Sequence, residues 1–452
     1  MGVESDRNGC GLHGALRLLD AIEDVVPIVH ANPGCAVGAF GSDRVAGGPG
    51  AMCSSAGEVS ATILQEKQVV FGGTSRLREQ IKNTLKTVNG SLYAVVTACV
   101  PEVIGDDVSA MAKESREQRF PVVSISSPGF KANAFGGYAH AARALIEELA
   151  VHEIPAEQAS SDGAPVVNLF GLVPGYDVGY EGDLDEIEAL LSSIGIRVHR
   201  LIGFGQSVES WRRAPHAQLS VALSPWGIAA AAYLSSHHGV PSLDYGFVPT
   251  GSVDSGEFLE RVASALSFGQ DRVACVRADL ERRLRHFVRR ASPQLLLGDV
   301  QKTVAVVGSS ANAVGVARFL SGTLGQIVEL VVISDDVEED ARARIADLVR
   351  QAAPRARVEF SSRRASIARH LADARPELVL GSGLEVDLAR DVRAAFLEFS
   401  APLRQRPTFL RGYAGVRGAV LLIEDLLASL IAQSERARPS LAASPRLQEN
   451  AP

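Results

Sequence analysis

Three cysteines lie in glycine-containing segments that each border a hydrophobic stretch. They are Cys10 in CGLHGA (10–15), Cys35 in HANPGC (30–35) and Cys99 in CVPEVIGDD (99–107). Glycine lets a backbone approach a bulky group closely. Thiolates held on such loops, in a chain without a disulfide pattern, favour a soft metal centre and above all iron–sulfur chemistry. We therefore take these three cysteines as candidate cluster ligands.

A second interpretation of every cysteine is structural. A free cysteine usually behaves as a small buried hydrophobic residue. We expect this of Cys53, in AMCSSAG, and of Cys275, in RVACVRADL on a predicted helix. For the first three cysteines the spacing alone leaves both interpretations open, because it matches no compact ligand motif.

Composition excludes several classes of protein. A chain of 452 residues, 46% hydrophobic and 21% charged, is a normal soluble globular protein, and its length suggests about three domains. The formal net charge of -7 and the lack of a basic run argue against nucleic-acid binding. No segment reaches the roughly 18 apolar residues of a membrane span. Five cysteines form no disulfide framework and the N-terminus has no signal-like apolar core, so we expect a cytoplasmic protein.

Apolar strands and amphipathic helices alternate along the chain. Predicted strands cover 25–30, 68–73, 92–99, 121–127, 166–172, 303–309, 329–334 and 377–382. Predicted helices cover 75–88, 137–149, 184–194, 311–320 and 337–352. Continuous Val/Ile/Leu strands between helices indicate parallel sheets that are buried on both faces, with ligands at their carboxyl edges. The predicted fold class is α/β, with three doubly wound Rossmann-like domains.

Polar and charged stretches suggest where the domains meet. We predict a cluster-binding α/β domain over 1–160, a second α/β domain over 161–290, and a third over 291–433. An arginine-rich helix at about 272–292 should connect the second and third domains, and an apolar helix at 419–433 should return to the core. The remaining residues, 434–452, are rich in Pro, Ser and charge, which predicts a disordered tail.

Several segments together resemble one protein family. CGLHGA, DVVPIVHANPGC, VFGG and TACVPEVIGDD are similar to the nitrogenase component-1 superfamily, which includes nitrogenase subunits, cofactor-assembly homologues and nitrogenase-like reductases. The resemblance continues in SPGF (127–130), VPSLDYGFVPTG (240–251), TVAVVGSSANAVGVARFL (303–320) and PTFLRGYAGVRGAVLLIEDLL (407–427). It implies the component-1 fold.

The resemblance also implies a cofactor and partners. Cys10, Cys35 and Cys99 correspond to the three cysteines that each subunit contributes to an iron–sulfur cluster at the subunit interface. That cluster is an [8Fe-7S] P-cluster in nitrogenase and a [4Fe-4S] cluster in tetrapyrrole reductases. An α-type (D-like) subunit would supply the remaining ligands within an α2β2 heterotetramer. An ATP-dependent iron protein would dock transiently and deliver electrons.

The chain looks like the β-type (K-like) subunit of such a complex. The catalytic subunit of nitrogenase needs a cysteine at a helix start in its middle domain and a histidine near its C-terminus. Here the middle segment reads VALSPWGIAAAAYLSSHHGVPSL and the last histidine is His370, so we expect no catalytic residues in this chain. The adjacent His237 and His238 point in different directions on a helix and favour a solvated helix end.

The polar residues around the third cysteine have a structural interpretation too. Gly105-Asp106-Asp107 should cap the following helix, while the family reading places Glu102 and both aspartates near the surface that faces the reductase partner. His30, before the HANPGC cysteine, could satisfy loop carbonyls or tune a cluster through a hydrogen bond.

Two departures separate the chain from conventional nitrogenase. Nitrogenase β subunits carry a serine, after the third cysteine, that can ligate the oxidised P-cluster. Here Asn133 aligns with it, leaving Ser126 and Ser127 as neighbours. HANPGC also replaces the familiar HG-x-x-GC loop through Ala31 and Asn32.

Nucleotide binding has little support. VVGSSANAVG (306–315) follows a predicted strand but lacks the G-x-G-x-x-G pattern, and no P-loop motif occurs. We expect its glycines to form tight strand-to-helix turns.

The functional hypothesis is therefore a β-type subunit that relays electrons to an active-site cofactor in its α partner. For the whole complex, methylthio-alkane reductase, which cleaves carbon–sulfur bonds, is the favoured substrate-level hypothesis. The alternatives are an alternative-metal nitrogenase, a tetrapyrrole reductase and a non-catalytic cofactor-assembly scaffold.

Overall fold

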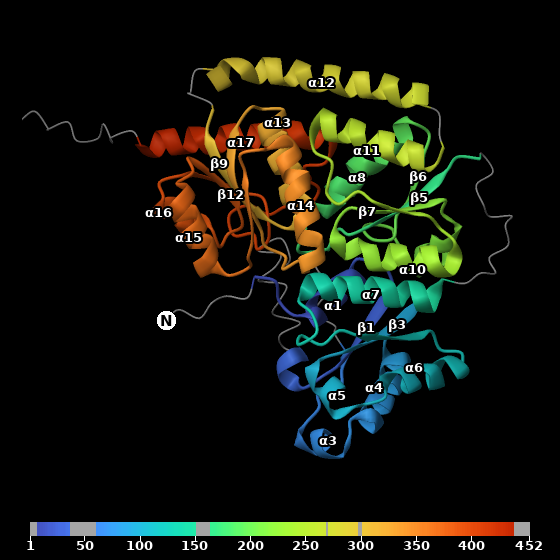
Figure 1. Cartoon of the computed structure of the whole chain (residues 1–452). Coiled ribbons are helices and arrows are strands. Elements are labelled where there is room, and N and C mark those ends of the chain that lie inside the picture. Colours follow the sequence, from blue (N-terminus) through green and yellow to red (C-terminus); the bar gives the residue numbers. More distant parts are fainter. Residues whose placement is uncertain (1–6, 37–59, 151–162, 268–269, 297–300, 438–452) are drawn as a thin grey trace, which may run out of the picture.

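The computed structural model describes residues 7–36, 60–150, 163–267, 270–296 and 301–437. In these ranges the strands form three separate sheets with parallel pairing throughout, and helices cover them (Figure 1). The predicted α/β class with three doubly wound units is confirmed. The strands of the sheets span 25–126, 166–244 and 303–398. Each sheet falls inside one predicted domain range, and the domain limits themselves stay a prediction.

The first sheet has the order β2-β1-β3-β4. Its strands are β1 (Val25–His30), β2 (Ser60–Ala61), β3 (Leu92–Thr97) and β4 (Val122–Ser126). Along β3, Leu92, Ala94 and Val96 pack toward α1 (Gly11–Asp20) and α7 (Ala134–Leu149). Tyr93 and Val95 pack toward α4 (Thr74–Thr87) and α6 (Val108–Glu117). The strand is buried on both faces, which explains its unbroken apolar sequence.

The second sheet has the order β6-β5-β7-β8. Its strands are β5 (Val166–Phe170), β6 (Arg197–His199), β7 (Leu219–Ala222) and β8 (Ser242–Asp244). The accompanying helices are α8 (Tyr180–Ser193), α9 (Val208–Arg213), α10 (Ile228–His238) and α11 (Gly251–Ala265). Each sheet with its helices is called a unit below, numbered in chain order. Helix α7 packs against both α1 and α10, so it joins the first unit to the second.

The third sheet has the order β11-β10-β9-β12-β13. Its strands are β9 (Thr303–Gly308), β10 (Ile327–Ile333), β11 (Arg357–Phe360), β12 (Leu378–Gly381) and β13 (Ala395–Glu398). The helices between them are α13 (Ser310–Gly322), α14 (Glu339–Ala352), α15 (Arg364–Ala374) and α16 (Val386–Asp391). From β9 the chain adds β10 and β11 on one side of the sheet, and then crosses over to add β12 and β13 on the other side. The strand β9 therefore lies between β10 and β12.

Two long helices connect the second and third units. The arginine-rich helix is α12 (Gln270–Leu296), which crosses the top of both units in Figure 1. The final helix, α17 (Gly415–Ala437), packs against α8, α11 and β13 and so returns to the core. It continues past position 433, where we predicted the tail to begin, and the rest of the predicted tail lies outside the described residues. No helix in the described ranges is both long enough and apolar enough to cross a lipid bilayer.

Helices α1 and α7 cross at very short range. A Cβ atom added at Gly14 would lie 1.6 Å from the carbonyl oxygen of Ala134, and one added at Gly137 would lie 1.9 Å from that of Gly11. Only glycine allows this contact between the two backbones. The crossing holds the start of α1 against the loop that precedes α7.

The predicted strand at 68–73 is wrong, because this segment forms the helix α3 (Glu66–Phe71). The sheet edge beside β1 is taken by β2, and the Gln65 amide donates to the Gln68 side chain in the first turn of α3. The apolar residues of α3 remain on the surface. The short strands β2, β6, β7, β8, β11 and β13 have no predicted counterpart, since each is too brief to give a clear periodic signal.

Candidate metal centre

The three candidate cysteines lie at the carboxyl edge of the first sheet. Cys35 is in the helical turn 33–36 that follows β1, and Cys99 is the first residue of α5 (Cys99–Ile104), just after β3. Because β1 and β3 are parallel neighbours, both cysteines leave the sheet at the same edge. Cys10 immediately precedes α1. None of the three forms a disulfide within the described residues, and all three are half-buried.

Gly129, in the loop after β4, brings two of the thiols together. A Cβ atom at this position would lie 3.7 Å from the Sγ atoms of both Cys10 and Cys99, and 2.9 Å from the Cβ of Cys10. Cys10 is fixed against the same loop, because the Gly11 amide donates to the carbonyl of Ala132 at 2.8 Å. The spacing of the cysteines could not reveal Gly129, although the SPGF motif that contains it was part of the family resemblance.

Cys35 belongs to the same group of thiols. Burial raises the pKa of its thiol, and the nearby charges of Cys10 and Cys99 raise it further. Soft metal cations bind thiolates and offset this mutual repulsion. In the described residues no three His, Cys, Asp or Glu side chains converge tightly enough for a single metal ion. A polynuclear cluster does not require such convergence on one ion, because each of its irons takes its own thiolate.

Glu102 ties the Cys99 helix to the surrounding strand ends. Its carboxylate accepts hydrogen bonds from Ser126 at 2.7 Å, from Thr97 at 2.5 Å and from Lys131 at 2.9 Å. Against the opposing effect of burial, these hydrogen bonds hold the pKa of Glu102 below its usual value. Glu102 is therefore a brace between α5, β3 and the loop that carries Gly129.

His30 is held away from the thiols. It is fully buried, and its ring nitrogens contact Thr62 Oγ1 at 3.1 Å and Asp106 Oδ2 at 3.0 Å. Burial lowers the pKa of His30, although Asp106 opposes this. Both nitrogens are thus engaged with other groups, and a direct hydrogen bond to Cys35 is not formed.

The two aspartates that follow α5 have different partners. Asp107 caps α6 as predicted, accepting from the Ala110 amide at 3.0 Å. Asp106 instead accepts from the Gly73 amide at 2.7 Å, at the start of α4. Asp106 therefore links α4 to His30 rather than capping the next helix.

The oxygen-bearing residues after β4 also differ in role. Asn133 caps α7 by accepting from the Gly136 amide at 3.1 Å, and its amide group donates to the Asp335 carbonyl at 3.1 Å. Ser127 is fully buried, and its hydroxyl has no hydrogen-bond partner among the described residues. That hydroxyl would lie 2.9 Å from a Cβ atom at Gly11, so it sits directly beside the backbone that follows Cys10.

The remaining cysteines and histidines lie elsewhere. Cys275 was expected to be buried, but it is exposed on α12, where it borders an apolar groove between α8, α12 and α17. Cys53 lies outside the described residues. His237 and His238 end α10, with His237 exposed and stacked on Tyr233, as predicted for a solvated helix end.

The segment 306–315, which weakly resembled a dinucleotide fingerprint, is hydrogen-bonded to two carboxylates at the start of α13. Phosphates in doubly wound sheets bind at a helix N-terminus such as that of α13. Here Asp177 accepts from Ser309 Oγ at 2.6 Å and from Asn312 at 3.0 Å. Asp335 accepts from the amide and hydroxyl of Ser310 at 3.1 and 2.6 Å. Both aspartates are buried and occupy the place that a phosphate would need.

Comparison with known proteins identifies the family. A family model described as nitrogenase component 1 type oxidoreductase matches residues 10–431. The chain belongs to this family. The match begins at Cys10 and includes all three candidate ligands and all three sheets.

Individual members of the nitrogenase component 1 family are similar over most of the chain. The nitrogenase molybdenum-iron protein beta chain of Methanothermobacter thermautotrophicus is 25% identical over 439 residues, covering 92% of each chain. The nitrogenase iron-molybdenum cofactor biosynthesis protein NifE of Bradyrhizobium diazoefficiens is 29% identical over 266 residues, or 58% of this chain and 46% of that one. A solved structure titled "Nitrogenase Cp1 at pH 6.5" aligns with a TM-score of 0.78 at 18% identity, covering 97% and 95% of the two chains. The component-1 fold is thereby established.

Proposed function

We propose that this chain is the β-type subunit of a nitrogenase-like reductase and holds half of an iron–sulfur cluster shared with an α-type subunit. The observation that carries the proposal is the convergence of Cys10, Cys35 and Cys99 from three separate segments at one sheet edge. Their half-buried thiols leave room for ligands from a second chain. The similarity to nitrogenase beta chains over 92% of the sequence supports the same role.

The residues around the thiols fit such a group. When bound, the cluster supplies a one-electron redox centre of the [8Fe-7S] or [4Fe-4S] type. Cys10, Cys35 and Cys99 would bind it, and Gly129 would leave space beside two of the sulfurs. The Ser127 hydroxyl, which has no partner in the described part of the chain, offers a donor next to the first ligand. Hydrogen bonds of this kind and exclusion of water adjust a cluster's potential.

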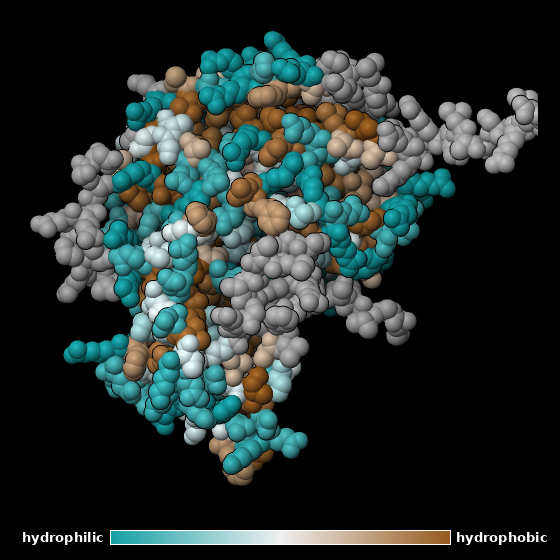
Figure 2. All heavy atoms as spheres, turned by 180° about the vertical axis from the view of Figure 1, so that it is seen from behind, coloured by the Kyte–Doolittle hydropathy of each residue, from teal (hydrophilic) through white to brown (hydrophobic). Residues whose placement is uncertain are grey.

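An exposed apolar surface adjoins the third cysteine. Helix α3 has no buried residue, and Val70, Phe71 and Val103 are 73%, 81% and 74% exposed. Helices α3 and α5 are in contact, so this surface reaches the helix that begins at Cys99. Figure 2 has apolar spheres at the lowest tip of the molecule, which α3 occupies in Figure 1. Contiguous exposed apolar residues mark interaction sites, and we assign this one to the ATP-dependent iron protein.

The complex we propose is an α2β2 heterotetramer in the cytoplasm. Its substrate chemistry belongs to the α subunit, because this chain lacks the cysteine and histidine that hold an active-site cofactor. Just before the short turn 225–227 that leads into α10, where that cysteine would be expected, Ser224 donates to the Gly171 carbonyl instead. Asn133 stands in place of the family's serine and separates the chain from conventional nitrogenase. Because of this departure, we propose a nitrogenase-like reaction, the carbon–sulfur bond reduction of methylthio-alkanes.

The primary experiment counts iron. The chain is purified anaerobically in complex with its α-type subunit, and iron per heterodimer is measured. Iron bound by the α subunit alone is subtracted by measuring the Cys35→Ala complex beside the parent: a loss of about eight atoms supports a P-cluster and a loss of about four a [4Fe-4S] cluster, whereas no loss refutes the proposal. Cys35→Ala should abolish the shared cluster, while Cys275→Ala is the matched control and should leave the iron content unchanged. Assays with methylthio compounds and with dinitrogen then separate the substrates.

A second candidate function is a scaffold for cofactor assembly. The 29% identity to NifE over 58% of the chain favours it. A scaffold would bind a metallocluster precursor and transfer it to another protein without turning over a substrate. Transfer of iron to an apo-acceptor, with no reductase activity in the purified complex, would support the scaffold over the reductase.

A further inference from the structure

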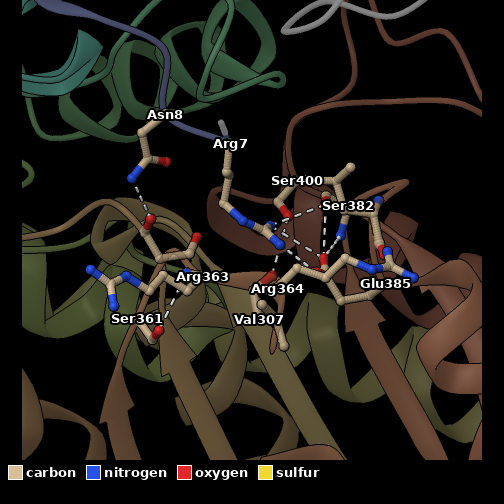
Figure 3. Close-up of polar contacts among 11 residues, drawn as sticks. Arg7, Asn8, Val307, Ser361, Arg363, Arg364, Ser382, Glu385 and Ser400 are labelled. Carbon is tan, nitrogen blue, oxygen red and sulfur yellow. Dashed lines mark hydrogen bonds and ion pairs between the residues drawn. The ribbon is translucent and has the colours of Figure 1, made fainter. Parts of the chain in front are cut away.

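The segment just before Cys10 is anchored in the third unit, far away in sequence. Arg7 is 5% exposed and forms a buried ion pair with Glu385. Its Nη1 atom donates to Glu385 Oε2 at 3.2 Å and to Ser382 Oγ at 3.1 Å. Ser382 directly follows β12, so Arg7 binds at the carboxyl end of that strand (Figure 3).

Asn8 binds a different strand of the same sheet. It is 2% exposed, and its side-chain amide donates to the Ser334 carbonyl at 2.7 Å and to Asp336 Oδ2 at 2.8 Å. Ser334 directly follows β10. Since β9 lies between β10 and β12, these two consecutive residues straddle its carboxyl end. In Figure 3 their side chains point to the two separate strands.

The same short segment is fixed to the other two units. The Asn8 carbonyl accepts from the Ala134 amide at 3.0 Å, at the start of α7. Gly9 adopts φ +59° and packs beside the Tyr176 hydroxyl, which comes from the second unit. Residues 7–9 therefore contact all three units immediately before the first candidate ligand.

We propose that Arg7 and Asn8 are positioning residues for Cys10, with Glu385 and Asp336 as their anchors. The segment connects the third sheet to the ligand, so the placement of Cys10 depends on an acidic pair more than 300 residues away. This inference rests on the proposed function in one respect only, namely that Cys10 binds the cluster. The anchoring itself is a property of the chain without metal.

Thiol reactivity tests the anchoring. In the metal-free full-length chain, the alkylation rate of each cysteine is measured by mass spectrometry. Glu385→Gln and the paired Arg7→Met/Glu385→Gln should raise the rate at Cys10 about tenfold, because local opening becomes easier, and leave Cys99 unchanged. The paired variant removes both charges together, so no buried charge is left alone. Arg363→Ala is the control and should change neither rate, because the Arg363 side chain points away from Arg7 and Glu385 in Figure 3.

The assembled complex supplies a second readout. The same variants should alter the electron paramagnetic resonance spectrum of the cluster, and Arg7→Lys, which keeps the positive charge opposite Glu385, should alter it less. Equal alkylation of Cys10 in wild type and variants, with an unchanged spectrum, would overturn the inference. A chain that binds no iron but shows the Cys10-specific rise in alkylation would refute the proposed function and leave the anchoring intact. A uniform rise at all three cysteines would mean general unfolding and would also contradict a positioning role.

Discussion

The carboxyl group of Asp177 accepts a 2.6 Å hydrogen bond from the hydroxyl of Ser309. This contact joins the loop after β5 to the N-cap residue of α13, and both residues are buried. Burial raises the pKa of Asp177 to about 7, with a further contribution from the charge of Asp335, although the hydrogen bonds oppose it. The contact between the second and third units therefore depends on pH.

Asp177→Asn tests that dependence. A carboxyl group whose pKa is raised on folding stabilises the native state most at low pH, and this stabilisation is lost as pH rises through about 7. Asparagine does not titrate, so the destabilisation it causes should be greater at pH 5 than at pH 8.5, by roughly 1–3 kcal/mol. Urea unfolding at the two pH values measures this difference. An equal cost at both would mean that Asp177 is ionised throughout.

His199 should show the opposite pH dependence. Burial, with the nearby Arg213 and His216, lowers its pKa to about 4, and its Nδ1 contacts Asn168 Oδ1 at 2.9 Å. As the pH falls below 6.5, His199 binds a proton in the unfolded chain, whereas in the native chain it stays neutral down to about pH 4. Stability is therefore fully present above pH 6.5 and is lost toward pH 4, by up to roughly 3 kcal/mol. His199→Gln should remove this part of the acid sensitivity, as followed by unfolding midpoints between pH 4.5 and 7.5, and identical pH curves would exclude it.

Gly129→Ala should damage the metal centre more than the fold. The added Cβ would lie 2.9 Å from Cys10 Cβ and 3.7 Å from two sulfurs, so Cys10 must shift. We expect reduced iron content in the complex with a loss of about 1–2 kcal/mol in stability. Gly322→Ala is the control, since its Cβ would meet only Ala352 at an ordinary 3.6 Å. Normal iron content in Gly129→Ala would show that the loop does not need to approach the thiols.

Gly14→Ala should instead affect folding. Its Cβ would lie 1.6 Å from the Ala134 carbonyl oxygen, and the two backbones would have to separate. We expect a loss of about 3 kcal/mol or more in the free energy of unfolding, measured by urea denaturation. A stable, fully folded variant would mean that α1 and α7 can repack at a larger distance.

Phe71→Ser should weaken docking of the iron protein without loss of the cluster. The ring is 81% exposed on α3, so its removal costs little folding energy and takes away apolar contact area. We expect about a tenfold rise in the dissociation constant, measured by titration with the iron protein. Phe204→Ser is the matched control, because Phe204 is 89% exposed in a loop of the second unit. Equal effects of the two substitutions would refute the docking surface.

The sequence by itself determined the class of fold and the candidate ligands. Continuous apolar strands such as β3 are a direct consequence of burial on both faces, and the cysteine motifs carried the family resemblance. Local pattern failed at 68–73, because an apolar run of this length is compatible with a strand or a helix. The choice depended on the neighbouring sheet edge, which β2 already occupies.

Only the tertiary structure decided how distant residues meet. Parallel pairing of β1 with β3 brings Cys35 and Cys99 to one edge, and the loop at Gly129 adds Cys10. The aspartates that close the N-terminus of α13 and the ion pair of Arg7 with Glu385 join residues separated by long stretches of chain. No local periodicity records such contacts, since they arise when separately formed units pack together.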